Sequence, residues 1–360
     1  MASYGTLSLA DTLAVDDADN IYVAEYGEDN LYAYANAVLT AHNAMFTDMA
    51  GDLVEYTNKR VSRYGTDFEL EMVEADEFGV ADAQFDNLTG TDIGWPLRAY
   101  QVALQWTRLF FEEKTLAEFT KQFDAITTGD VKRLEREIKR AFFRPTNYTF
   151  VDKRVDYVSL PVKALVNADG APIPRDQFGN SFDGSTHTHF LGTGSLADAN
   201  VQALVDTVIE HGTNGQVVIY CNRAQEASIR VMASFDPYPP ELIRPGGGST
   251  ADVAIGGTER YFELDDRPIG VWDGAIVVWT KPWVPANYIL CLALDSPGGK
   301  PLRFRTKRGA GKGDLRLMAN DEQYPLRANL FQREYGIGVW NRTSAAVLYT
   351  ANATYAAPTL

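Results

Sequence analysis

Two histidines in the run His187-Thr188-His189 are the residues of this chain best suited to chemistry. On a β-strand, residues i and i+2 point to the same face, so both imidazoles could share one metal ion such as zinc. Asp183 or Asp176 could supply a third ligand. However, the chain has only 4 histidines, and neither aspartate has a diagnostic spacing. The pattern therefore favours an alternating polar strand, and a metal-dependent hydrolase using His187 and His189 is kept as an alternative.

Two glycine-rich segments resemble nucleotide-binding loops only in part. The run Gly192–Ala197 matches G-x-G-x-x-A before a predicted helix, but the strand before it is polar and the next strand ends in Cys221-Asn222-Arg223. The second segment, Gly309-Ala310-Gly311-Lys312-Gly313, would place the lysine of a phosphate loop at Lys312. The first glycine of that motif would then fall at position 306, which is threonine, and its serine or threonine would fall at position 313, which is glycine. We expect neither segment to bind a nucleotide.

Carboxylates and hydroxyls give no stronger signal of catalysis. The run Gly179-Asn180-Ser181-Phe182-Asp183 lacks the second glycine of a nucleophile elbow. Glu69 and Glu71 share one face of a predicted strand, but paired carboxylates on a strand are usually only solvated. We therefore expect no catalytic residue, cofactor or metal, and predict that the chain is not an enzyme.

Charge is distributed very unevenly along the chain. Residues 1–100 contain 19 acidic and 4 basic residues, whereas residues 101–360 contain 29 of each, so the whole net charge of −15 lies in the first quarter. A nucleic-acid reader needs the opposite sign. A basic cluster near the other end is read as a solvated loop, or as a docking surface for a neighbour's acidic first quarter, or as a nucleic-acid contact. Its members are Lys300, Arg303, Arg305, Lys307, Arg308, Lys312 and Arg316.

Composition places the chain among globular proteins. With 360 residues, 45% of them hydrophobic, it can build one large core or two medium domains. Its only cysteines, Cys221 and Cys291, lie in apolar runs and are expected to be buried thiols. We expect no secretory signal, and no apolar run approaches the ~20 residues of a membrane helix.

The pattern before residue 144 predicts helices interrupted by a long excursion. Apolar residues at 3–4-residue spacing predict a helix over 31–46, a second short helix over 49–56 and a long amphipathic helix over 115–143, interrupted near Gly129. Residues 64–108 begin with period-2 alternation, contain no lysine and predict a hairpin-like excursion with a loose tip. An unsupported ribbon of this kind is marginal in water, so it needs a surface on which to lie.

The pattern after residue 144 predicts a small α/β lobe followed by closing strands. Ser195-Leu196-Ala197-Asp198 predicts a capping box that opens a helix to about Glu210. A buried strand over 217–220, a helix over 224–233 and strands over 276–280 and 288–294 follow. Two apolar runs, Ile337–Trp340 and Ala345–Tyr349, are strand-like and hold no reactive group.

This order of elements resembles the Hong Kong 97-type capsid fold of tailed bacteriophages, which encapsulin compartments share. The resemblance implies an α+β fold with an N-terminal arm, an extended β loop, a long spine helix, and peripheral and axial domains. Carried onto this sequence, it implies an N-terminal arm and helix at 1–63, the extended loop at 64–110, the spine helix and peripheral domain at 111–165, the axial domain at 166–299, and a return to the peripheral domain at 300–360.

The resemblance also implies a function. The implied function is that of a major capsid protein, which assembles into hexamers and pentamers of an icosahedral head. This head encloses double-stranded DNA, and the protein contacts the DNA without sequence preference. Scaffolding, portal and decoration proteins are the implied partners, the virion is the implied location after assembly in the host cytoplasm, and no membrane is involved. An encapsulin-like compartment is the alternative within the same class. The lysine-free excursion argues against the isopeptide cross-links of the type member.

Under this interpretation, the charged and aromatic residues of the excursion and of the basic cluster become candidate subunit contacts. They are Glu69, Glu71, Trp95, Arg98, Arg303, Arg305, Lys307 and Arg308.

Overall fold

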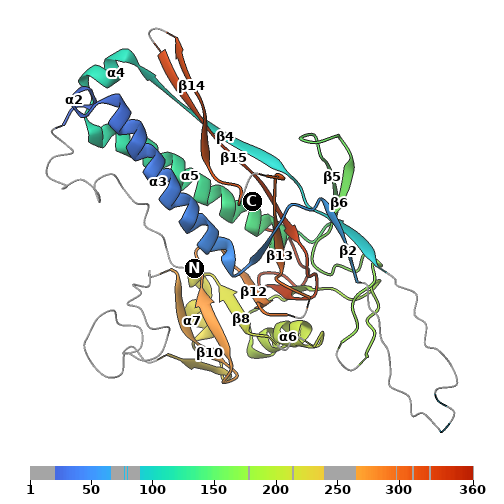
Figure 1. Ribbon diagram of the computed structural model, residues 1–360. Coiled ribbons are helices and arrows are strands. Elements are labelled where there is room, and N and C mark those ends of the chain that lie inside the picture. The colour runs from blue at the N-terminus through green and yellow to red at the C-terminus, as the bar shows by residue number, and fades with distance from the viewer. Residues whose placement is uncertain are drawn as a thin grey trace.

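The computed structural model describes most of the chain and places its elements in two main sheets and a helical layer (Figure 1). The described residues are 21–65, 77, 79, 90–176, 179–212, 215–238, 265–296, 298–309, 312–323 and 326–359. The predictions for the arm before residue 21, and those for Glu69 and Glu71, lie outside these residues. None of the described helices is both long and apolar enough to cross a membrane.

The longest of the described helices is α5, Leu116–Phe143, which confirms the amphipathic helix predicted over 115–143. Thr115 caps its first turn and Glu118 bonds back to the Thr115 backbone, so a capping box fixes where the helix begins. The predicted interruption at Gly129 is wrong, because the helix runs through this position without a break. One glycine costs a helix only about 1 kcal/mol, which burial of its apolar face outweighs.

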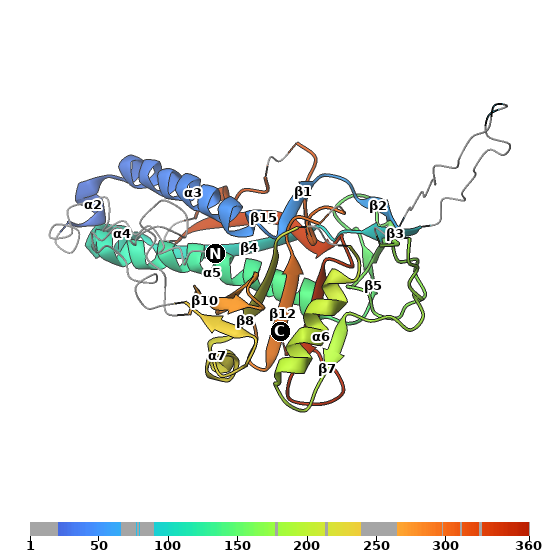
Figure 2. The same cartoon turned by 90° about the horizontal axis from the view of Figure 1, so that it is seen from below.

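Three further helices lie beside the first half of α5 (Figures 1 and 2). They are α2, Val23–Tyr26; α3, Glu28–Gly51; and α4, Arg108–Glu113. The short helix predicted over 49–56 is wrong: α3 continues to Gly51, and strand β1, Val54–Thr57, follows. Val54 packs into the core as β1 pairs in parallel with β13, so tertiary pairing overrides the helical spacing.

The first main sheet has five strands built around the long strand β15. Its strands are β1, β4 (Arg98–Thr107), β13 (Leu302–Thr306), β14 (Arg316–Gln323) and β15 (Leu326–Val339). One edge of β15 pairs with β4 over ten residues, while the other edge pairs first with β14 and then with β13. Strands β4, β14 and β15 extend together alongside α3 and α5 (Figure 1).

The second main sheet has seven strands in the order β7-β16-β12-β8-β11-β10-β9. Their bounds are β7 Phe190–Gly192, β8 Val217–Cys221, β9 Phe235–Pro237, β10 Arg267–Trp272, β11 Ile276–Thr280, β12 Tyr288–Ala293 and β16 Ala345–Tyr349. The segment 300–360 is therefore divided, with β13, β14 and β15 in the first sheet and β16 in the second.

Two helices cover one face of this second sheet. Helix α6, Asp198–Ile209, packs through its inward valines and leucine, and α7, Arg223–Ile229, packs through Ile229. The opposite face packs against the end of α5 and the first sheet. All six residues of β12 are buried, as expected for a central strand covered on both faces. The capping box predicted at Ser195 is wrong, because Ala197 is the N-cap and the Asp198 side chain instead accepts from Ser234.

Two small ribbons complete the described fold. Strand β2, Val61–Tyr64, pairs with β3, Thr91–Gly94, so the predicted excursion is a two-stranded ribbon at its base. Strand β5, Tyr148–Val151, pairs with β6, Ser159–Val162.

Replacing Gly129 by alanine should stabilise the chain. A Cβ added at this mid-helix position would meet nothing within 4 Å, and alanine loses less backbone entropy than glycine. We expect a gain of about 0.5–1 kcal/mol in the free energy of unfolding, measured by urea denaturation of unassembled subunits. A loss of stability would show that the helix needs glycine here.

The two cysteines should be unreactive in the folded chain. Cys221 and Cys291 are both fully buried and free, as predicted, and burial raises the pKa of each thiol to about 12. Because the thiolate is the nucleophile, a thiol-specific reagent at pH 8 should label neither residue in native protein and both after denaturation. Rapid native labelling would contradict this placement.

Candidate functional site

A buried ion pair holds Arg305, one member of the predicted basic cluster, inside the chain. Arg305 Nη2 lies 2.7 Å from Asp152 Oδ2, and Arg305 Nη1 donates to the Trp95 carbonyl at 2.8 Å. Both side chains of this ion pair are almost fully buried, and Trp95 is itself buried beneath Trp340. Arg305 and Trp95 are therefore engaged within the subunit, and their side chains are not presented to a neighbour as the interface prediction requires.

The remaining predicted contacts differ in how far they reach the surface. Arg303 is partly buried, stacks 3.7 Å from the centre of the Trp340 ring and pairs with Glu55. Arg98 lies 5.1 Å from the centre of the Phe150 ring. Lys307 and Arg308 are exposed at the end of β13. Of the described candidates, these last two are the ones most available to a second subunit.

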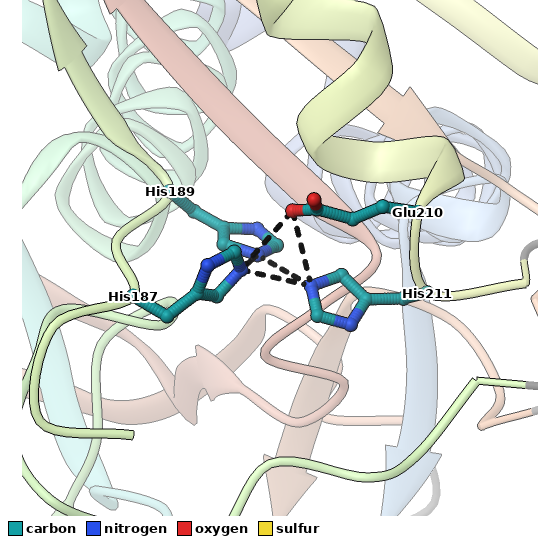
Figure 3. Close-up of side chains that lie close together, drawn as sticks. All are labelled: His187, His189, Glu210 and His211. Carbon is teal, nitrogen blue, oxygen red and sulfur yellow. Dashed lines mark hydrogen bonds and ion pairs between the residues drawn. The ribbon is translucent and has the colours of Figure 1, made fainter. Parts of the chain in front are cut away.

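Three of the chain's four histidines meet at one end of helix α6 (Figure 3). The Nε2 atoms of His187, His189 and His211 lie 3.0–3.2 Å from one another. Glu210 Oε1 lies 3.2 Å from His187 Nε2 and 3.8 Å from His211 Nε2. All four side chains point toward a common centre. We call this group the histidine cluster.

The backbone around the histidine cluster is fixed by hydrogen bonds to other elements. The His189 amide donates to the Val166 carbonyl at 2.8 Å, and the Val347 amide of β16 donates to the His189 carbonyl at 2.8 Å. On the other side, Glu210 is the C-cap of α6, and Gly212, with φ +70°, turns the chain away. The cluster thus joins the end of α6 to the segment that enters β7.

The sequence prediction found only half of this cluster. His187 and His189 do share one face, but the third-ligand candidates are wrong. Asp183 accepts from Ser185 and Thr186 in its own turn, and Asp176 accepts from Asn180. Glu210 and His211 complete the group instead, and the short bridge at Thr188 replaces the expected polar strand.

Burial keeps the imidazoles neutral. It lowers the pKa of His187, lowers that of His189 strongly, and lowers that of His211 to about 3, with the neighbouring histidines adding to the effect on the last two. His189 Nδ1 lies 2.7 Å from the Ala345 carbonyl oxygen, so Nδ1 must carry the proton and Nε2 must be a bare acceptor. The neutral imidazole is the form that binds metals.

Comparison with known proteins identifies the fold. No family model and no curated protein matches the sequence. The structure, however, is similar to a solved structure from Mycobacterium phage Patience, with a TM-score of 0.65 and 21% sequence identity over 94% of this chain and 95% of that one. The chain has the Hong Kong 97-type capsid fold. The α+β class and the capsid fold predicted from the order of elements are thus confirmed.

Two further solved structures match with lower TM-scores. The capsid of an empty GTA particle matches with a TM-score of 0.49 and 15% identity over 84% of this chain and 89% of that one. The holo-SrpI encapsulin complex from Synechococcus elongatus matches with a TM-score of 0.43 and 13% identity over 87% of this chain and 90% of that one. In the capsid fold of this chain, α5 lies where the spine helix is predicted, and the β2–β3 ribbon lies at the base of the predicted extended loop.

Proposed function

We propose that this chain is a major capsid protein that assembles into hexamers and pentamers of an icosahedral phage head. The observation that carries the proposal is the capsid fold over 94% of the chain. In this assignment the domains are those predicted from the sequence, except that β16 joins the seven-stranded sheet, and that β1 and β4 join the five-stranded sheet. The virion, after assembly in the host cytoplasm, is the proposed location. Packaged double-stranded DNA, bound without sequence preference, and scaffolding, portal and decoration proteins are the proposed partners.

Exposed apolar side chains support assembly through surfaces. The turn that joins β5 to β6 exposes Val155 at 56%, Tyr157 at 70% and Val158 at 49%. The three-stranded extension of β4, β14 and β15 exposes Val102, Met318 and Leu326, and Leu109 lies nearby on α4. Apolar groups gathered on a few projecting elements are typical of protein–protein contact sites. We assign both regions to contacts with further copies of this chain.

The turn between β5 and β6 offers a direct test of this assignment. A Val155→Asp variant should fold, because the side chain lies at the surface, yet it should fail to form particles because the contact would bury a charge. Multi-angle light scattering after size exclusion gives the particle mass, and circular dichroism checks the fold. The control Val155→Ile keeps the apolar surface and should assemble. Normal particles from Val155→Asp would remove this turn from the interface.

Assembly should also depend on salt. We propose that exposed Lys307 and Arg308 contact the acidic first quarter of a neighbouring subunit, including Glu69 and Glu71. Contacts between exposed charges are screened with a Debye length of ~10 Å at 0.1 M salt and ~3 Å at 1 M. Light scattering should therefore show slower or less complete assembly at 1 M than at 0.1 M. Equal assembly at both concentrations would reject this electrostatic contact.

The contents of the particles distinguish the two functions that share this fold. A phage head assembled in infected cells should enclose DNA, whereas an encapsulin-like compartment should enclose a protein cargo. Nucleic-acid absorbance and mass spectrometry of purified particles measure both. A cargo enzyme without DNA would favour the compartment.

A further inference from the structure

The histidine cluster cannot be explained by hydrogen bonds alone. A favourable contact between two imidazole nitrogens needs one donor and one acceptor. Three nitrogens at mutual distances of 3.0–3.2 Å form a triangle, and no assignment of donors and acceptors satisfies all three sides. With His189 Nε2 an acceptor, every combination of tautomers of His187 and His211 leaves at least one donor–donor or acceptor–acceptor contact. Protonating the rings makes the repulsion worse.

A cation bound to all three nitrogens removes this conflict. Zinc binds imidazole nitrogen at about 2.0–2.1 Å, so two ligands on a tetrahedral ion lie about 3.3 Å apart. The separations of 3.0–3.2 Å between histidine nitrogens, and of 3.2 Å between His187 and Glu210, are close to this value, and Glu210 lies somewhat farther, 3.8 Å, from His211. All four ligand atoms lie within 4.8 Å of one another.

We propose that His187, His189, His211 and Glu210 bind one divalent transition-metal ion, best matched by Zn²⁺, as a structural site in the shell subunit. Imidazole and carboxylate ligands suit this class of ion, and a set of four protein ligands leaves no open position for catalysis. The proposal replaces the sequence expectation of no metal, and it does not depend on the proposed capsid function.

The surroundings have the features of a metal site. His189 is fully buried, and its Nδ1–H donates to the Ala345 carbonyl, which is the outer contact that orients a metal-binding imidazole. The Phe182 ring covers His211 at 4.2 Å and His187 at 5.3 Å between ring centres, which limits access of water. The C-terminal end of α6 adds a partial negative charge that favours a cation.

The position of the site indicates what the ion does. Two ligands precede β7 and two follow α6, and the backbone of His189 is bonded both to Val166 and to β16. Bound metal therefore ties the end of α6 to the edge of the seven-stranded sheet. Ions that bind only the folded state stabilise it by mass action.

Metal analysis of the purified full-length protein tests the proposal. Expressed with zinc in the medium, wild-type protein should retain about one equivalent of Zn²⁺ per chain after desalting. Replacing zinc with Co²⁺ should give the intense visible bands of a tetrahedral site. Removal by a chelator should lower the melting temperature, and added Zn²⁺ should restore it.

Substitutions in the cluster distinguish a loss of metal binding from a loss of folding. His187→Gln and Glu210→Gln change partly exposed side chains, so the chain should still fold. His187→Gln should lower Zn²⁺ affinity by more than the roughly 10–100-fold that loss of an outer-shell partner costs, and Glu210→Gln should alter the Co²⁺ spectrum. Asp183→Asn, outside the cluster, should retain one equivalent. Metal-free wild-type protein whose melting temperature does not respond to Zn²⁺, or equal binding by all variants, would overturn the site. Zinc-dependent ester hydrolysis abolished by His187→Gln would overturn its structural role.

Discussion

Replacing Arg333 by methionine should cost about 3–5 kcal/mol of folding free energy, because it removes the guanidinium that pairs with a buried carboxylate. Arg333 Nε lies 2.9 Å from Asp130 Oδ2, and the two side chains are exposed by only 1% and 6%. His42 Nε2 lies 2.9 Å from the same carboxylate oxygen. Arg333, Asp130 and His42 come from β15, α5 and α3, so their contacts connect the first main sheet to both long helices.

Further contacts make Arg333 hard to replace. Its guanidinium donates to the Gly313 carbonyl at 2.9 Å and to Asn43 Oδ1 at 2.6 Å, and it stacks 3.7 Å from the centre of the Phe46 ring. Burial lowers the pKa of Arg333, while the charge of Asp130 acts in the opposite direction. Methionine can fill much of the volume but can satisfy none of these acceptors.

Urea unfolding of unassembled subunits measures this prediction, and Arg108→Met is the matched control. Arg108 pairs with Glu112 at 2.8 Å on the surface, where its side chain is 69% exposed, so its loss should change stability by no more than about 0.5 kcal/mol. Equal changes in the free energy of unfolding would show that the buried ion pair of Arg333 stabilises the fold no more than an exposed one does.

Replacing Gly336 by alanine should destabilise the fold by about 3 kcal/mol or more, the upper end of the usual cost of overpacking. A Cβ at this position of β15 would overlap the carbonyl oxygen of Pro96, which is backbone and cannot rotate away. Gly338 is also closely covered, though less tightly, since its Cβ would come within 2.9 Å of the Trp95 ring. The two glycines therefore let the segment after β3 cross directly over β15.

Soluble yield and melting temperature measure the effect of Gly336→Ala. Gly129→Ala provides the control, because it makes the same chemical change at a position with open space and should act in the opposite direction. A Gly336→Ala protein as stable as wild type would show that the crossing at Pro96 leaves room for a Cβ and does not require glycine.

The long helices could be predicted from sequence because their burial follows a simple period, and the central strands could be predicted because they are short apolar runs. Helix α5 buries Leu116, Phe119, Phe123 and Ile126 at 3–4-residue spacing, which fixes its face regardless of what packs there. Strand β1 was missed because its four residues are stabilised by pairing with β13, nearly 250 positions later in the chain. The spacing of apolar residues within β1 does not indicate this distant partner.

The functional residues were harder to predict because they depend on tertiary contacts. Arg303 and Arg305 alternate with Leu302 and Phe304, which suggests a solvated face, yet β13 is covered on both sides and Arg305 is buried against Asp152. His211 joins His187 and His189 only because α6 brings the chain back beside β7. The available signal was a histidine and a glutamate together at the predicted helix end, within 25 residues of the first pair.

The most direct test of the assembly proposal is electron microscopy of the purified full-length chain, with particle mass measured by light scattering on the same sample. We predict closed icosahedral shells with five-fold and six-fold clusters of subunits, in which the turn between β5 and β6 lies against a neighbouring copy. A stable monomer of 39.8 kDa that forms no shell at any salt concentration, alone or with a scaffolding protein, would contradict the proposal.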